Sequence, residues 1–132
     1  FKVRFSSSWN QWHESYILDN TKYQRAWSAG NNGAGQWIQV ESSKPKRWTS
    51  VVTQGRGDPS FPQWIETFHV LSSMDGEIWE YVDKGITFTG NYNANTKIKN
   101  TFDKPVYAKI IRILPLEYYG HKSLRFDVLY TD

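Results

Sequence analysis

The chain of 132 residues contains no cysteine, so neither a disulfide frame nor a thiolate nucleophile is available to it. No apolar run approaches the 18 residues that a membrane-spanning helix needs. Gly-x-Ser-x-Gly, His-Glu-x-x-His and phosphate-binding glycine loops are also missing. Glu14, Asp58 and Glu117 could pair as glycosidase carboxylates, but a sandwich of this size offers no deep cleft around a scissile bond. These absences argue against an enzyme.

The signals for cellular location point in different directions. No Asn-x-Ser/Thr sequon occurs, and the absence of cysteine would by itself favour a reducing compartment. The chain opens at Phe1 with strand-like sequence and shows no signal peptide. We interpret it as an excised or mature domain whose upstream targeting segment is absent.

Helical periodicity is nearly missing, whereas alternation of apolar and polar residues recurs. From Val106 to Leu114 both faces are largely apolar, which is typical of a strand covered on both sides. Leu124 to Tyr130 alternates as a half-buried strand, and Trp64 to Leu71 indicates a third. With turn signals such as Asp75-Gly76 between the strands, the pattern predicts one all-β domain over residues 1–132.

Aromatic residues make up 17% of the chain, with seven Trp and eight Tyr. This exceeds what one small core needs, and these two residues suit half-wet binding surfaces. The net charge of +3 is a mild excess that favours acidic surfaces without the footprint of a nucleic-acid-binding protein.

An ordered set of short β-type signatures runs through the chain and is specific as a set. Its members are Gln36–Glu41, Val51–Arg56, Trp64–Ser72, Ser73–Gly76 with Trp79–Tyr81, Phe88–Asn91, Asn100–Val106 and Ile110–Pro115. In this order and spacing they resemble the discoidin domain, also called the coagulation factor V/VIII type C domain, over almost the whole chain.

The resemblance implies an eight-stranded antiparallel jelly-roll sandwich with ligand-binding loops at one end. The loops would be Ser6–Glu14, Ala29–Gly35, Arg56–Gln63 and Pro115–Ser123. Gln54–Asp58 and Ser123–Arg125 are most similar to the slime-mould discoidins, which are galactose and N-acetylgalactosamine lectins. Many members of the family join their termini by a disulfide that this chain lacks, and Phe126 in the terminal strand could replace it by packing.

Trp9, Trp12 and His13 lie in the first loop, before any strong strand pattern. An exposed indole can stack on the apolar face of a galactose ring or enter the interface of a bilayer. Both indoles could instead cap the sandwich, although the polar neighbours of Trp12 favour a role in the site.

Arg56 follows a strand between two glycines, and its planar guanidinium could bond vicinal hydroxyls or a carboxylate. Asp58 could share that site or simply form an ion pair with Arg56. The tripeptide Arg56-Gly57-Asp58 also spells an integrin-recognition motif, which we interpret as a coincidence because such short matches are common.

Further polar contacts are expected from loop residues that carry amide, phenol and imidazole groups. These are Asn31, Asn32, Tyr118, Tyr119 and His121. Of the two adjacent tyrosines only one should face the site. The aromatic residues in or beside strands are predicted to form the core, namely Trp27, Trp37, Trp48, Trp79, Phe68, Phe88 and Phe102.

A structural Ca²⁺ is a further expectation from related sugar-binding domains. Asp19, Thr21 and Asp127 stand near the places that would hold it, although Asp127 replaces a more usual Glu. Ca²⁺ needs six to eight oxygen ligands, many of them backbone carbonyls that a sequence does not reveal.

These observations predict a non-catalytic, lectin-like module that binds galactose-type glycans on glycoproteins or polysaccharides through the loops. Two alternatives stay open, a peripheral membrane module that binds phosphatidylserine and an adhesion module that binds a receptor or matrix protein. The expected location is extracellular or at the cell surface, as one domain of a larger protein or oligomer, and nucleic acid is not an expected partner.

Overall fold

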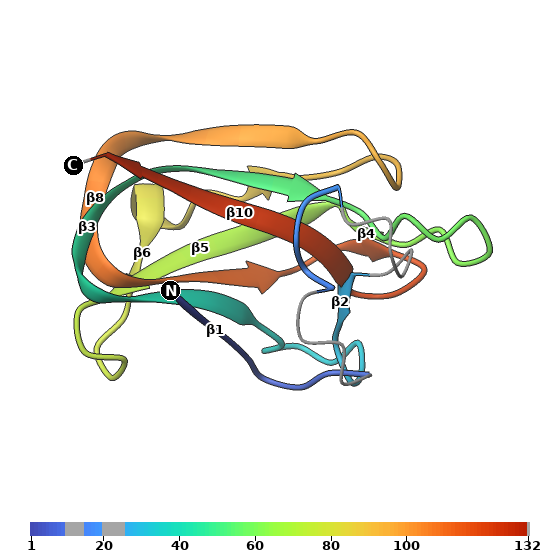
Figure 1. Ribbon diagram of the computed structural model, residues 1–132, viewed down its shortest axis with the longest axis horizontal. Helices are drawn as coiled ribbons and strands as arrows, with labels where there is room; N and C mark the ends of the chain where they lie inside the picture. The colour runs from blue at the N-terminus through green and yellow to red at the C-terminus, as the bar shows by residue number, and fades with distance from the viewer. Residues whose placement is uncertain (10–14, 20–25, 132) are drawn as a thin grey trace.

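The chain folds into two facing β-layers that are joined at one end by two long bent strands (Figure 1). The computed structural model describes residues 1–9, 15–19 and 26–131. The strands in these ranges are β1 (Lys2–Phe5), β2 (Trp27–Ser28), β3 (Ile38–Gln54), β4 (Trp64–Ile65), β5 (Thr67–Ser73), β6 (Glu80–Tyr81), β7 (Phe88–Thr89), β8 (Ile98–Pro115), β9 (Tyr118–Tyr119) and β10 (Ser123–Thr131). The helical content of this part of the chain is one short 3₁₀ element, η1 (Val82–Gly85).

Eight strands form one antiparallel hydrogen-bonded system in the order β2-β10-β3-β8-β5-β6, with β1 on β3 and β7 on β5. β4 and β9 form a separate antiparallel pair. This arrangement confirms the predicted all-β, eight-stranded antiparallel jelly roll.

β3 and β8 each run through both layers. The start of β3 (38–41) pairs with β1 and with residues 110–113 of β8, whereas its end (47–54) pairs with β10 and with residues 98–107 of β8. Register shifts between Glu41 and Lys46 and between Trp48 and Ser50 mark the bend. Pro45 and Pro105 lie in this irregular region, where a missing N–H removes no regular ladder bond.

Aromatic and branched side chains fill the space between the layers. Trp27, Trp48, Phe68, Phe88 and Phe102 are each at most 4% exposed, which confirms their predicted place in the core. The indole Nε1 of Trp48 donates to the carbonyl of Ala108 at 2.8 Å, so this buried donor is satisfied. This packing joins the two layers in a chain without cysteine.

The core prediction is wrong for Trp37 and Trp79. Both indoles are half-buried on the outer side of the β8 layer, where they stack on the guanidinium of Arg112 at 3.8 and 3.9 Å from the ring centroids. Tyr130 also departs from its predicted alternation, since it is 40% exposed and packs edge-on against Trp48.

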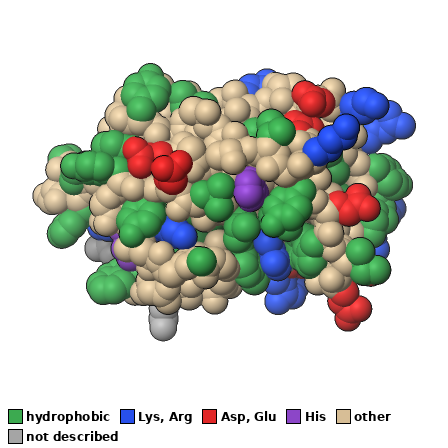
Figure 2. Space-filling view, turned by 180° about the vertical axis from the view of Figure 1, so that it is seen from behind, with side chains coloured by type: hydrophobic (Ala, Val, Ile, Leu, Met, Phe, Trp, Pro, Cys, Tyr) green, Lys and Arg blue, Asp and Glu red, His purple; other side chains and the backbone are tan. Residues whose placement is uncertain are grey.

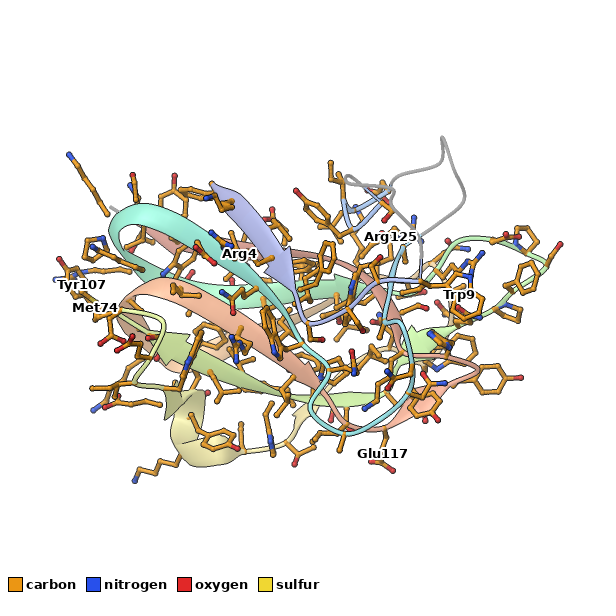
Figure 3. The ribbon with its side chains drawn as sticks, turned by 90° about the horizontal axis from the view of Figure 1, so that it is seen from below. Arg4, Trp9, Met74, Tyr107, Glu117 and Arg125 are labelled. Atoms are coloured by element: carbon orange, nitrogen blue, oxygen red, sulfur yellow. The ribbon has the colours of Figure 1, made fainter. Side chains whose placement is uncertain are left out.

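The loops gather at the end of the sandwich opposite the bends in β3 and β8 (Figure 1). Trp9 and Arg125 lie at this end, whereas Met74 and Tyr107 lie at the other (Figure 3). The loops that the sequence predicts to bind ligand are therefore brought together by the ends of β2, β3, β8 and β10.

Candidate ligand-binding site

Backbone hydrogen bonds tie the loops at this end into one unit. The N–H of Trp9 donates to the carbonyl of Ser28 at 2.8 Å, and that of Ala29 donates to Lys122 at 2.9 Å. The hydroxyl oxygen of Ser7 accepts from the N–H of Gly30 at 2.8 Å. The first, second and last loops thus support one another, which fixes the side chains they carry.

A pocket of about 370 Å³ opens between these loops. Its lining residues are Trp9, Ser28, Arg56, Phe61, Gln63 and His121. Three of the predicted site residues, Trp9, Arg56 and His121, therefore meet in one place. Trp9 is 71% exposed and Phe61 is 53% exposed, so two aromatic side chains of the pocket are open to solvent.

The third loop holds Arg56 as a fixed hydrogen-bond donor. The backbone N–H of Arg56 donates to the carbonyl of Gln63 at 2.8 Å, which closes the loop. The side chain of Arg56 is only 15% exposed, and its guanidinium lies over the ring of Phe61 at 5.0 Å. Nη1 donates to Oε1 of Gln63 at 3.3 Å, and Nη2 lies 3.5 Å from Asp58. Arg56 is thus pre-oriented, which lowers the entropy that a ligand must overcome.

The ion pair of Arg56 and Asp58 also bears on the integrin motif. Their side chains are 15% and 20% exposed and face each other across Gly57. An integrin-binding tripeptide needs an extended, exposed loop tip, so the structure supports the interpretation of this motif as a coincidence. Asp58 does not line the pocket and acts on it through Arg56.

A short chain of hydroxyl groups orients Gln63, a residue that sequence reasoning did not assign to the site. The hydroxyl of Ser123 donates to Oε1 of Gln63 at 2.8 Å and lies 2.8 Å from the hydroxyl of Ser28. Because Oε1 also accepts from Arg56, the Nε2 amide of Gln63 is left as a donor with no partner among the described residues. No pattern in the sequence distinguishes this glutamine from the others.

His121 completes the pocket with a defined tautomer. Its Nε2 lies 2.7 Å from the carbonyl oxygen of Ala29, and a carbonyl can only accept, so Nε2 carries a proton. In the neutral ring Nδ1 is then an acceptor, and it has no hydrogen-bond partner among the described residues. The ring meets Trp9 edge-on with centroids 6.2 Å apart. The pocket therefore offers an indole, two donors and one acceptor.

Asn31 and Asn32 serve the loops rather than the pocket. Oδ1 of Asn31 accepts from the N–H of Gly33 at 2.8 Å, and Oδ1 of Asn32 accepts from the N–H of Lys122 at 2.8 Å. Neither residue lines the pocket. Lys122 is 3% exposed and donates to the carbonyl of Gly33 at 3.1 Å, and burial lowers the pKa of its ammonium group.

Tyr118 and Tyr119 form β9 beside the pocket without lining it. Tyr119 is 50% exposed and stacks on Trp64 with centroids 4.4 Å apart and an interplanar angle of 11°. Tyr118 is 37% exposed, with the ammonium of Lys122 5.9 Å from its ring centroid. Neither tyrosine packs inward, in contrast to the expectation that one of them would. Trp12 and His13 lie outside the described residues.

The carboxylates expected to hold Ca²⁺ have other partners. Asp19 forms an ion pair with Lys97, and its Oδ1 accepts from Nε2 of Gln54 at 3.2 Å. These two partners, Lys97 first, lower the pKa of Asp19. Asp127 is exposed and accepts from the N–H of Val128 at 2.9 Å, while Thr21 lies outside the described ranges. The ammonium of Lys97 thus stands where a cation would bind to Asp19. The described residues contain no cluster of three or more His, Cys, Asp or Glu side chains that could hold a metal ion.

Comparison with known proteins gives the family. The model of the F5/8 type C domain matches residues 2–128. The chain belongs to the F5/8 type C, or discoidin, domain family. Among the described residues, no helix has the length and hydropathy to cross a membrane.

Curated relatives of the chain are much longer proteins. EGF-like repeat and discoidin I-like domain-containing protein 3 of Mus musculus is 38% identical over 117 residues, which cover 85% of this chain and 24% of the relative. Lactadherin of Rattus norvegicus is 33% identical over 139 residues, which cover 97% of this chain and 33% of the relative. The chain thus spans about a quarter to a third of the length of these relatives.

Solved structures agree with the family. Discoidin II from Dictyostelium discoideum is 27% identical with a TM-score of 0.88, over 98% of this chain and 54% of that one. The family 32 CBM from C. perfringens NanJ, solved in complex with galactose, has a TM-score of 0.68 at 17% identity, over 96% of this chain and 93% of that one. At this identity the CBM supports the shared fold alone.

Proposed function

We propose that this F5/8 type C domain is a non-catalytic carbohydrate-binding module that takes galactose-type sugars in the pocket of Trp9, Arg56 and His121. The observation that carries this proposal is the exposed indole of Trp9 beside fixed polar groups. Sugar hydroxyls both donate and accept, and the pocket supplies donors on Arg56 and Gln63 and an acceptor on His121. The indole can cover the apolar face of the ring.

Two modules that share this fold are solved with galactose-type sugars. The NanJ module is solved in complex with galactose, and a second module from Clostridium perfringens, with a TM-score of 0.77, is solved with GalNAc-β-1,3-galactose. The glycan would be carried by a glycoprotein or polysaccharide outside the cell or at its surface, with this domain as one part of a larger protein. No step in binding requires Ca²⁺, since the polar contacts come from side chains of the pocket.

Phosphatidylserine membranes are the second candidate, because two apolar side chains project from neighbouring loops. Trp9 and Phe61 are 71% and 53% exposed, and such side chains can enter the interface of a bilayer. The pocket lining contains Arg56 but no lysine, so the cationic attraction to anionic lipid is weak. A receptor or matrix protein could dock through the same two rings.

A glycan array and a pull-down with phosphatidylserine vesicles, run in parallel, separate these candidates. If the ligand is a sugar, we expect hits with galactose-terminated glycans. Trp9→Ala should reduce the affinity for these glycans at least about tenfold, a loss of ~1.4 kcal/mol in binding free energy, with little change in thermal stability. Tyr107→Ala is the matched control, because Tyr107 is 64% exposed at the opposite end of the sandwich (Figure 3).

Salt concentration provides an independent test of the ligand class. Sugar binding through stacking and neutral hydrogen bonds should change little between low and high ionic strength, whereas binding to anionic lipid should weaken steeply. Salt-sensitive binding to vesicles without any glycan hit would contradict the sugar proposal and support the membrane candidate.

A further inference from the structure

Arg112 occupies an unusual place on the outer face of the layer formed by β1, β3, β8, β5 and β6. Its guanidinium carbon lies 3.8 Å from the ring centroid of Trp37 and 3.9 Å from that of Trp79. Its neighbours in β8, Ile111 and Ile113, are fully buried in the core, so alternation along the strand directs Arg112 outward. The two indoles hold the charged group in one orientation.

The hydrogen bonds of Arg112 leave one edge of the guanidinium available. Nε donates to Oε1 of Gln39 at 2.8 Å, whereas Nη1 and Nη2 have no partner among the described residues. Neither nitrogen is a fully buried unsatisfied atom, so both can be reached from solvent. The indoles cover the two flat faces of the guanidinium. A ligand can therefore approach Nη1 and Nη2 only in the plane of the guanidinium. In-plane approach is the geometry in which a carboxylate accepts two parallel N–H bonds.

Arg112 is part of a straight row that crosses the strands. The pairing registers place Arg4, Gln39, Arg112, Leu71 and Tyr81 side by side on β1, β3, β8, β5 and β6. Both ends of the row are open to solvent, since the side chain of Arg4 is 55% exposed and Tyr81 is 52% exposed at the far end. A linear ligand lying across the strands would meet these groups in order.

The charge along this row is positive overall. Glu41 is the acid that faces it, and its Oε2 accepts from Nε of Arg4 at 2.9 Å and from Nε2 of Gln39 at 2.8 Å. Arg4 thus forms an ion pair with Glu41, whereas Arg112 has no ion pair among the described residues. Burial lowers the pKa of Arg112, and the charge of Glu41 acts in the opposite direction, but a guanidinium stays protonated in a protein.

The surroundings of the row are mixed in character. On the side of the molecule opposite β10, hydrophobic side chains gather around a central histidine, with basic and acidic groups beside them (Figure 2). His69 belongs to this face, where its ring meets Tyr81 edge-on at 5.3 Å. Fixed aromatic walls around an oriented cation are a preorganised site for an anion.

We propose that this outer face is a second ligand site, separate from the loop pocket, which takes an acidic polysaccharide with a carboxylate bound in the plane of Arg112. The straight row favours a linear polymer over a compact ligand, and the net positive charge favours an acidic one. None of the residues lining the loop pocket belongs to the row.

The test compares polygalacturonate with its fully methyl-esterified form, which has the same backbone without the charge. Retardation in affinity electrophoresis should occur with the acidic polymer alone. Arg112→Gln should reduce that affinity at least about tenfold, and Arg112→Lys should recover only part of it because an ammonium lacks the planar fork. Arg47→Gln removes the same charge from an exposed position in the other layer and should have little effect.

Chemical-shift mapping of the wild-type protein provides a test that requires no variant. Polygalacturonate should shift the side-chain signals of Arg112 and the indole N–H signals of Trp37 and Trp79. Equal losses for Arg112→Gln and Arg47→Gln, equal binding of the esterified polymer, or shifts confined to the loop pocket would each overturn the proposal. The loop-site proposal is tested separately, because Trp9→Ala should leave binding at Arg112 intact.

Discussion

At the scale of single residues, Arg125 shows how a buried charge supports the loop end. Its side chain is 2% exposed, and Nε donates to the carbonyl of Gly55 at 2.7 Å. Nη2 donates to the carbonyl of Ala94 and to Oδ1 of Asn95, both at 3.0 Å. The guanidinium thus pairs with oxygens from two loops at once, and the backbone beneath Arg56 depends on it.

We expect Arg125→Lys to lower the free energy of unfolding by about 3 kcal/mol, because an ammonium cannot reach all of these acceptors and leaves buried or part-buried oxygens unpaired. Urea unfolding measures the change. Arg4→Lys is the control, since the exposed ion pair of Arg4 with Glu41 should contribute less than about 1 kcal/mol. Equal losses in the two variants would contradict the role assigned to Arg125.

Asp19 leads to a prediction about metal. Because the ammonium of Lys97 already holds this carboxylate, Ca²⁺ would have to displace it before binding. We expect the thermal midpoint to stay within about 1 °C when chelator or millimolar Ca²⁺ is added, since a ligand stabilises a fold only if it binds the folded state. A clear fall with chelator, removed by Asp127→Asn, would support the Ca²⁺ site expected from the sequence.

At the scale of elements, the loop after β3 begins with a glycine for a steric reason. A Cβ added to Gly55 would lie 2.8 Å from the carbonyl oxygen of Gln63 and 2.9 Å from Cα of Ala94. Both contacts are with backbone atoms, which cannot rotate away. The close approach lets Arg56 and Gln63 pair across the base of the loop.

Gly55→Ala should therefore destabilise the fold by about 2 kcal/mol, in the range of overpacking substitutions, and should also weaken binding in the loop pocket. Thermal unfolding and titration with the sugar identified by the glycan array measure the two effects. A variant with unchanged stability and affinity would show that the loop can shift at no cost.

The sequence predicted the type and order of the elements better than their extent. Alternation placed Leu124, Phe126 and Val128 correctly in the core. The family signatures covered β3 only as two separate pieces, Gln36–Glu41 and Val51–Arg56, whereas β3 is continuous from Ile38 to Gln54 with a bend around Pro45. Trp37 was assigned to the core because the cation that covers it lies 75 positions further along the chain.

The site was predictable only where the residue type itself carries the chemistry. The sequence identified three pocket residues by the chemistry of their side chains and their place in loops, namely the indole of Trp9, the guanidinium of Arg56 and the imidazole of His121. Gln63 did not, because its role depends on hydrogen bonds to Arg56 and Ser123 that the sequence does not encode locally. Asn31 and Asn32 have the right chemistry, but their carbonyl oxygens are used within the loops.

At the scale of the whole molecule, two aspartates make the stability of the fold depend on pH. Backbone N–H groups of Ile78 and Glu77 lower the pKa of Asp75, and Lys97 and Gln54 lower that of Asp19. A folded-state pKa below the usual 3.8 means that each carboxylate stabilises the fold above that pH. The stabilisation is lost as the pH falls through the lowered values.

Urea unfolding between pH 6 and pH 2 should accordingly show a falling free energy below about pH 4. Asp75→Asn keeps an acceptor for the N–H groups of the turn but cannot titrate, so its profile should be flatter than that of the wild type. A variant that loses stability in parallel with the wild type over this range would contradict the assignment.

The passage of β3 and β8 through both layers determines how the domain can open. A sandwich whose layers share no strand can lose one layer while the other persists, and its amide protons then exchange in separate classes. Here Val40 and Val51 belong to one continuous strand that reaches both layers. Breaking either layer frees half of β3 and half of β8, so the core amides on both sides should exchange with a common free energy, close to that of global unfolding.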